Sequence, residues 1–229
     1  MKHLKQRIHV WLRALRDAMG HDTFSLPRSE AFDLPYSLSL TQPFTASATL
    51  EQKKHNLRIA GERIVRHTIM PGEVFSFWRA VGNPNTSQFM ESRSIIAGCL
   101  QLERGGGLCQ ASGIIHHLAV MAGLEIVERH NHSVDLYTEE TRFCPLGSDA
   151  TVSYGYKDLR VRNSTTSPIR FELIVGDDCF EARLLSGEPI EKCEITFERS
   201  TDPDGMLVAK TIDGSSGAVI AVSRYHTLQ

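Results

Sequence analysis

Three consecutive glycines followed by leucine, cysteine and glutamine constrain the fold of this chain more than any other feature. They occupy residues 105–110, and residues 108–122 repeat apolar side chains at helical spacing. We therefore predict a tight turn that leads into a central helix with Cys109 at its start. A thiol there lies among unpaired backbone N–H groups at the positive end of the helix dipole, which lowers its pKa and favours the thiolate. The alternative is that Cys109 serves as a small buried hydrophobe of a core helix.

The composition narrows the classes of protein to consider. The chain has 229 residues, 41% of them hydrophobic, which is enough for a sizeable core. Its net charge of −2 gives no bulk electrostatic attraction to nucleic acid, so no nucleic-acid partner is expected. Five cysteines occur without a Cys-x-x-Cys pair, which fits a reducing compartment better than a disulfide framework. We accordingly expect a cytoplasmic protein that needs no cofactor.

Residues 2–18 predict a basic amphipathic helix. The chain has no run of about 18 apolar residues that could span a bilayer, and its N-terminal segment lacks the apolar core of about 7–15 residues of a signal peptide. The apolar stripe comprises Leu4, Ile8, Trp11, Leu12 and Leu15, and the basic residues are Lys2, Lys5, Arg7, Arg13 and Arg16. We favour docking of the apolar stripe onto the protein body. Peripheral contact with an anionic membrane at its inner face is the alternative.

The remaining patterns predict an α+β fold. Residues 20–48 are rich in Pro, Ser and Thr and indicate an irregular linker, whereas residues 49–68 have helical spacing, with Thr49 as a candidate cap. Residues 74–78 predict a strand or a packed hydrophobic loop. Further short strands are predicted around the central helix and after it, at 94–97, 124–127, 133–137, 150–154, 159–161, 169–175, 180–184 and 193–197. We expect the central helix, led by the Gly-rich turn and Cys109, to pack on an antiparallel sheet, with further helices at the N-terminal side.

The same patterns suggest a division of the chain into three parts. Residues 1–48 would form the amphipathic helix and linker, residues 49–199 the α+β domain, and residues 200–229 a β-like extension. The extension contains two turn signals, Asp-Gly at 204–205 and Asp-Gly at 213–214, between short β-like runs.

A candidate catalytic set follows the order cysteine, histidine, aspartate. Cys109 is the candidate nucleophile, and His130 and His132 lie in or beside the strand that returns from the central helix. Their spacing of two places both imidazoles on one face if that strand is regular. Asp149 begins the next predicted strand and could orient the imidazole. Each of these residues also has a structural interpretation, as a surface turn, a core histidine or a turn aspartate.

Acyl transfer also needs donors for an oxyanion, and the predicted helix start offers them. Gln110 and the backbone around Gly107 are the candidates. A zinc site formed by Cys109, His130 and His132 is a further alternative, because a thiolate and two imidazoles are suitable zinc ligands. We rank it below acyl transfer because the His-x-His pattern with a remote cysteine is unspecific.

Four ordered motifs in residues 50–175 resemble the VanW family, which is named for an accessory protein of vancomycin B-type resistance clusters. The motifs are Pro-Gly-Glu-x-Phe-Ser-Phe-Trp at 71–78, Gly-Gly-Gly-Leu-Cys-Gln at 105–110, Glu-Arg-His-x-His at 128–132, and Gly-x-Asp-Ala-Thr at 147–151 with Asp-Leu-Arg-Val-Arg-Asn at 158–163. The pair that usually follows Gln110 is Ser-Ser or Ser-Asn, and here it is Ala-Ser. The resemblance implies a link to cell-envelope or peptidoglycan processes and a peptide or peptidoglycan-precursor ligand.

The order of the candidate residues is also similar to that of the transglutaminase-like cysteine-protease core, in which Cys begins a helix and His and Asp follow on successive strands. This similarity implies a cysteine-dependent acyl-transfer enzyme such as an amidase, peptidase or transpeptidase. Cys109 would attack, His132 (preferred) or His130 would accept its proton, and Asp149 would orient the ring. The alternative is a non-catalytic accessory or binding module of the envelope.

Overall fold

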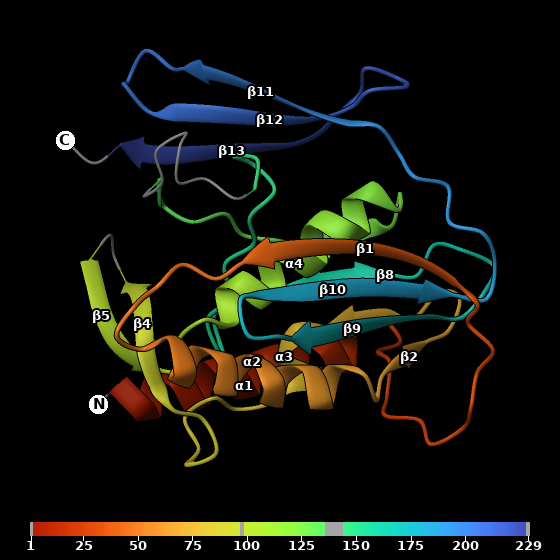
Figure 1. Ribbon diagram of the computed structural model, residues 1–229, viewed down its shortest axis with the longest axis horizontal. Coiled ribbons are helices and arrows are strands. Elements are labelled where there is room, and N and C mark those ends of the chain that lie inside the picture. The colour runs from red at the N-terminus through yellow and green to blue at the C-terminus, as the bar shows by residue number, and fades with distance from the viewer. Residues whose placement is uncertain (1, 97–98, 136–143, 228–229) are drawn as a thin grey trace.

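The computed structural model describes residues 2–96, 99–135 and 144–227 (Figure 1). These residues form a mixture of helices and mainly antiparallel sheets, so the predicted α+β class is confirmed. The helices of the described part are α1 (Lys2–Met19), α2 (Leu50–Ile64), α3 (Phe77–Val81) and α4 (Leu108–Met121).

The described strands belong to four groups. The largest sheet has the order β1 (Tyr36–Pro43), β10 (Cys179–Ser186), β9 (Ile169–Val175), β2 (Thr68–Ile69), all antiparallel. A second sheet has the order β11 (Ile195–Thr201), β12 (Leu207–Asp213), β13 (Val219–Thr227), β7 (Val134–Asp135), with β7 parallel to β13. A three-stranded sheet has the order β3 (Val74–Ser76), β8 (Arg160–Arg162), β6 (Glu125–Glu128). The fourth group is the pair of β4 (Glu91–Ile96) and β5 (Cys99–Arg104).

Helix α4 lies at the centre of the molecule because it is apolar around most of its circumference. It contacts β10 and β1 of the largest sheet and β6 of the three-stranded sheet, while α2 packs against β9 (Figure 1). Its fully buried apolar side chains are Ala111, Ile114, Ile115, Leu118 and Ala119. Burial of each Ile or Leu side chain contributes about 1.5–3 kcal/mol to the stability of the fold, so α4 anchors the core.

Two of the recognisable motifs meet each other. Strand β3 pairs with β8, and the buried Asp158 carboxylate accepts hydrogen bonds from Ser76 Oγ (2.6 Å) and the Trp78 amide (3.0 Å). The motifs at 71–78 and 158–163 are therefore explained by packing and by satisfying a buried carboxyl group.

Most predicted elements are present, with three corrections. Of the predicted strand at 74–78, only Val74–Ser76 is a strand, because the Ser76 side chain caps the short helix α3, which begins at Phe77. The helix within 49–68, the strands at 169–175 and 180–184, and the turns at 204–205 and 213–214 are confirmed. The segment 20–48 is not irregular throughout, because β1 pairs along its full length with β10. Residues 150–154 do not form a strand; their polar backbone groups bond to neighbouring segments instead. Of the predicted strand at 133–137, only β7 falls within the described residues.

The expected docking of the apolar stripe of α1 is wrong. The polar side of α1 faces the body: Arg13 forms an ion pair with Glu128 (2.6 Å), and Asp17 forms one with Arg160 (2.8 Å). The apolar stripe is exposed, with Trp11 at 61%. Among the described residues, no helix is both long and apolar enough to cross a membrane.

A buried asparagine on α2 holds the backbone of the Gly-rich turn that precedes α4. Asn56 Nδ2 donates to the carbonyls of Met90 and Gly106 (3.0 Å each), and its Oδ1 accepts from the Met90 amide (2.8 Å). At Gly106 a Cβ would lie 2.4 Å from the carbonyl oxygen of Ser92, so only glycine fits there. The side chain of Asn56 thus supplies hydrogen-bond partners for the backbone groups of Met90 and Gly106 in this tightly packed region.

Replacing Asn56 by Ala should lower the free energy of unfolding by about 2–4 kcal/mol, because it leaves buried backbone groups of Met90 and Gly106 without partners. Urea denaturation followed by circular dichroism measures the change. The exposed Asn85→Ala variant is the control and should change stability by at most about 0.5 kcal/mol. Equal stability of the two variants would contradict this role of Asn56.

Candidate functional site

The first turn of α4 holds Cys109 in a fixed position. Gly107 precedes the helix with φ of 98°, a left-handed conformation, and a Cβ on it would lie 2.7 Å from Lys53 Cγ. The glycine therefore permits both the backbone reversal and the close approach of α2. Cys109 follows in the first turn, where backbone N–H groups point out of the helix. The position predicted for the thiol is the one observed.

An extended segment, residues 148–152, runs along one face of α4 and forms the next part of the site. Three side chains of α4, spaced by three and four residues, contact alternate carbonyls of this segment. The contacts are Cys109 Sγ to Val152 O (3.5 Å), Ser112 Oγ to Ala150 O (2.6 Å) and His116 Nδ1 to Ser148 O (2.7 Å). Burial, followed by the charge of Arg129, lowers the pKa of His116 to about 4, so this histidine is neutral and serves as a hydrogen-bond donor.

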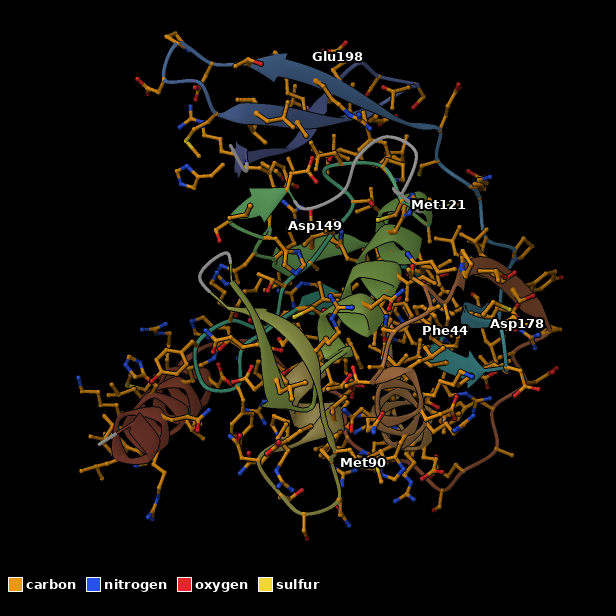
Figure 2. All side chains as sticks on the ribbon, turned by 60° about the vertical axis from the view of Figure 1, so that its left-hand side comes forward. Phe44, Met90, Met121, Asp149, Asp178 and Glu198 are labelled. Atoms are coloured by element: carbon orange, nitrogen blue, oxygen red, sulfur yellow. The ribbon has the colours of Figure 1, made fainter. Side chains whose placement is uncertain are left out.

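This segment carries Asp149, which lies between α4 and the sheet that contains β13 (Figure 2). One carboxylate oxygen accepts hydrogen bonds from Tyr225 Oη (2.5 Å) and Arg129 Nη2 (3.0 Å). The other accepts from the backbone amide (2.8 Å) and Nδ1 (2.7 Å) of His132. Burial alone would raise the pKa of Asp149, but the hydrogen bonds and positive charges of His132 and Arg129 hold it far below its usual value. Asp149 is therefore ionised.

His132 links this carboxylate to Cys109. Because Nδ1 is engaged by Asp149, Nε2 is the ring nitrogen of His132 that remains to interact with the Cys109 thiol. Burial opposes the imidazolium, yet Asp149 and Cys109 together raise the pKa of His132 to about 10. Burial would likewise raise the pKa of Cys109, but the hydrogen bond and charge of His132, and the hydroxyl of Thr151 at 3.5 Å, lower it. The two shifts favour a thiolate–imidazolium pair.

The other predicted histidine lies apart from the thiol. His130 Nε2 contacts Glu128 Oε1 at 3.0 Å, and only the backbone carbonyl of His130 meets the 148–152 segment, by accepting from the Thr151 amide (2.7 Å). Strand β6 ends at Glu128, so the regular spacing that would place both imidazoles on one face is absent. The structure thus brings His132, but not His130, to Cys109. Among the described residues no group of three or more His, Cys, Asp or Glu is placed to hold a metal ion, so the alternative zinc set is not assembled.

The predicted oxyanion donors lie beside the thiol. The amide of Gln110 bonds the Gly107 carbonyl (2.9 Å), and that of Leu108 bonds the Gly105 carbonyl (3.3 Å), which leaves the amides of Gly107 and Cys109 as the backbone candidates. The side chain of Gln110 points toward Gln42, with Nε2 at 3.4 Å from the Gln42 Oε1. The Oε1 of Gln110 is buried and has no hydrogen-bond partner among the described residues.

The thiol, His132 and Asp149 all line one cavity of about 440 Å³. That volume lies within the range of about 300–1,000 Å³ typical of small-molecule sites. Gln110, Gly107, Gln42, Trp78 and Lys53 also border it. Burial lowers the pKa of Lys53 to about 8. The cavity therefore combines a thiol, an imidazole beside it and a cation.

Two residues that hold Asp149 were not predicted from the sequence. Arg129 belongs to the Glu-Arg-His-x-His motif, and its guanidinium also donates to the Gly147 and Asp149 carbonyls (2.9 and 2.7 Å). Its position beside the two histidines was the signal that could have revealed it. Tyr225 lies on β13, 76 residues beyond Asp149, and no local pattern connects them.

Comparison with known proteins agrees with these motifs. The family model described as "VanW like protein" matches residues 52–185, more than half of the chain. The chain belongs to the VanW family. The match includes Cys109, His132 and Asp149, whereas α1, Gln42 and Tyr225 lie outside it.

Two curated relatives share this VanW region. The "Uncharacterized protein YoaR" of Bacillus subtilis (strain 168) is 36% identical over 120 residues, which cover 52% of this chain and 38% of the relative. The "Vancomycin B-type resistance protein VanW" of Enterococcus faecalis (strain ATCC 700802 / V583) is 33% identical over 129 residues, which cover 56% of this chain and 47% of the relative. The chain thus matches less than half the length of each. No solved structure matches it.

The thiolate–imidazolium pair predicts a pH-dependent reactivity. Cys109 should react with iodoacetamide well below pH 8.5, because His132 lowers its pKa. Replacing His132 by Gln removes the largest influence that opposes burial of the Cys109 thiol. It should slow alkylation at pH 7 by about tenfold or more, because each unit of pKa changes the thiolate fraction about tenfold. Mass spectrometry of the Cys109 peptide across a pH series measures the rate.

The matched control is His130→Gln, since His130 contacts Glu128 instead of the thiol. It should leave the alkylation profile of Cys109 unchanged. Labelling of the wild-type thiol only above about pH 8.5 would contradict the ion pair.

Tyr225 should act as a positioning residue through Asp149. Tyr225→Phe removes the 2.5 Å hydrogen bond to the carboxylate, which weakens its hold on His132 and should move the alkylation midpoint of Cys109 to higher pH. Stability should fall by about 1–2 kcal/mol. The exposed Tyr156→Phe variant is the control and should change neither quantity. A loss of stability without a shifted midpoint would limit Tyr225 to a structural role.

Proposed function

We propose that this protein is a cysteine-dependent acyl-transfer enzyme that acts on an amide bond. The observation that carries the proposal is the chain of contacts from Asp149 through His132 to Cys109, at the wall of a cavity. A nucleophile, a proton acceptor and a residue that orients the acceptor are the groups such catalysis requires. The three groups belong to Cys109, His132 and Asp149, which the sequence suggested as candidates for these roles.

The reaction begins with attack of the Cys109 thiolate on the carbonyl carbon of the substrate. The carbonyl π electrons move to oxygen, and collapse of this tetrahedral intermediate breaks the C–N bond and leaves a thioester on Cys109. The departing amine takes its proton from the His132 imidazolium. Water or an acceptor amine then attacks the thioester and gives its proton back to His132, which releases the acyl product and regenerates the thiolate–imidazolium pair.

Two groups are candidates to stabilise the negative oxygen. The Cys109 amide at the positive end of α4 would donate one hydrogen bond, and the Gln110 side-chain amide would donate another after turning from Gln42. The Gln42–Gln110 distance of 3.4 Å indicates a weak hydrogen bond that a substrate could replace. Gly107 keeps this part of the backbone close to the thiol.

The substrate class we propose is a peptide of the cell envelope, such as a peptidoglycan precursor. The name of the Enterococcus relative connects the family to glycopeptide resistance, and an amide in a stem peptide is a substrate that the proposed chemistry can cleave or transfer. Lys53 in the cavity wall would attract a carboxylate of such a peptide. The order of Cys, His and Asp along the chain supports a transglutaminase-like mechanism.

Incubation of the purified chain with a synthetic peptidoglycan stem pentapeptide tests this proposal. We expect an acyl adduct on Cys109 by intact-protein mass spectrometry and release of an amine product by chromatography. Cys109→Ala should abolish both, and His132→Gln should slow product release by about a hundredfold or more. Cys179→Ala, which changes a half-buried thiol on β10, is the control and should behave as wild type.

Product release that survives Cys109→Ala would contradict the proposal. Saturable binding of the pentapeptide to wild type without adduct or product would also contradict it, and would favour the alternative of a non-catalytic accessory or binding module.

A further inference from the structure

Helix α1 presents an apolar stripe to solvent. Six large apolar side chains on this helix are exposed, namely Leu4, Ile8, Trp11, Leu12, Leu15 and Met19. Contiguous exposure of this kind is uncommon on a soluble protein surface and usually marks a binding face. Among the described residues nothing covers the stripe.

The orientation of α1 is held by its opposite side. Gln6 Nε2 donates to the Tyr154 carbonyl (3.1 Å), Arg13 pairs with Glu128 (2.6 Å), and Asp17 pairs with Arg160 (2.8 Å). At about 100° per residue, Gln6, Arg13 and Asp17 lie on the helix side away from the apolar stripe. The polar contacts therefore fix α1 to the body with its apolar face turned outward.

The charges on α1 favour an anionic surface. The helix contains five Lys or Arg and one Asp, although the whole chain has a net charge of −2. Its acidic residue, Asp17, is occupied by Arg160 and Arg79. The exposed cations Lys5 and Arg16 border one edge of the apolar stripe and Arg7 borders the other. Basic residues at both edges of an apolar face are typical of helices that lie in a membrane interface.

We propose that α1 binds the surface of an anionic lipid bilayer, with its axis in the plane of the interface. The apolar stripe enters the boundary between headgroups and acyl chains, and Lys5, Arg7 and Arg16 contact lipid phosphates. A second copy of the chain fits this face less well, because pairing two stripes would bring their bordering cations together.

Membrane binding through α1 would also bring the candidate site to the bilayer. Gln6 lines the same cavity as Cys109, and Asn85, which also lines it, donates a hydrogen bond to Gln6 Oε1 (3.1 Å). The side of the helix opposite to the proposed membrane face therefore forms part of the cavity wall.

Vesicle flotation of the purified full chain tests the proposal. We expect binding to vesicles of phosphatidylcholine with about one third phosphatidylglycerol, weaker binding to pure phosphatidylcholine, and a decrease with salt. Leu4→Ser/Trp11→Ser should reduce binding by about tenfold or more, because both side chains leave water on insertion. Lys5→Gln/Arg16→Gln should reduce binding by about fivefold for each cation removed.

The matched control is Leu26→Ser/Leu102→Ser, which changes two apolar side chains of similar exposure (64% and 63%) outside α1. It should bind as wild type, and circular dichroism of all variants should be unchanged. Absence of binding to anionic vesicles would overturn the proposal. So would sedimentation showing a dimer that Leu4→Ser/Trp11→Ser dissociates, because the stripe would then be an interface between copies.

Discussion

The carboxylate of Asp149 is the interaction on which the site depends. It accepts four hydrogen bonds, two from His132 and one each from Arg129 and Tyr225. These donors come from the segment after β6 and from β13, while Asp149 itself is held against α4 by its neighbours. A half-buried, ionised carboxylate without these partners would be destabilising. The hydrogen bonds of Asp149 therefore join three parts of the chain.

The same geometry sets the chemistry of the thiol. His132 cannot rotate away from Cys109 without losing its Nδ1 bond to Asp149, and the imidazole is thereby oriented. Tyr225 and the hydroxyl of Ser223, which accepts from Arg129 (2.5 Å), both lie on β13. Strand β13 lies beyond residues 52–185, so a family motif is supported here by a segment outside the matched region.

The sequence predicted what depends on local pattern and missed what depends on distant contacts. The three glycines predicted a turn and the apolar periodicity predicted a helix, which together placed Cys109 at the start of α4. The order of Cys, His and Asp along the chain suggested His132 and Asp149 as its partners. The choice between His130 and His132 required the irregular backbone after Glu128, which spacing cannot reveal. The Pro-rich composition of residues 20–48 predicted an irregular linker, but pairing with the distant strand β10 makes β1 a regular strand. The outward stripe of α1 results from ion pairs such as Arg13 with Glu128, 115 residues apart.

The protonation state of His132 decides whether the thiolate–imidazolium pair exists. Nitrogen NMR of the imidazole in wild type and in Cys109→Ala would measure it across pH. The account predicts an imidazolium at pH 7 in wild type that loses its proton near pH 10, and a lower midpoint in the variant, where the charge of the thiolate is gone. A wild-type imidazole that is neutral at pH 7 and titrates near its ordinary pKa of about 6.5 would contradict it.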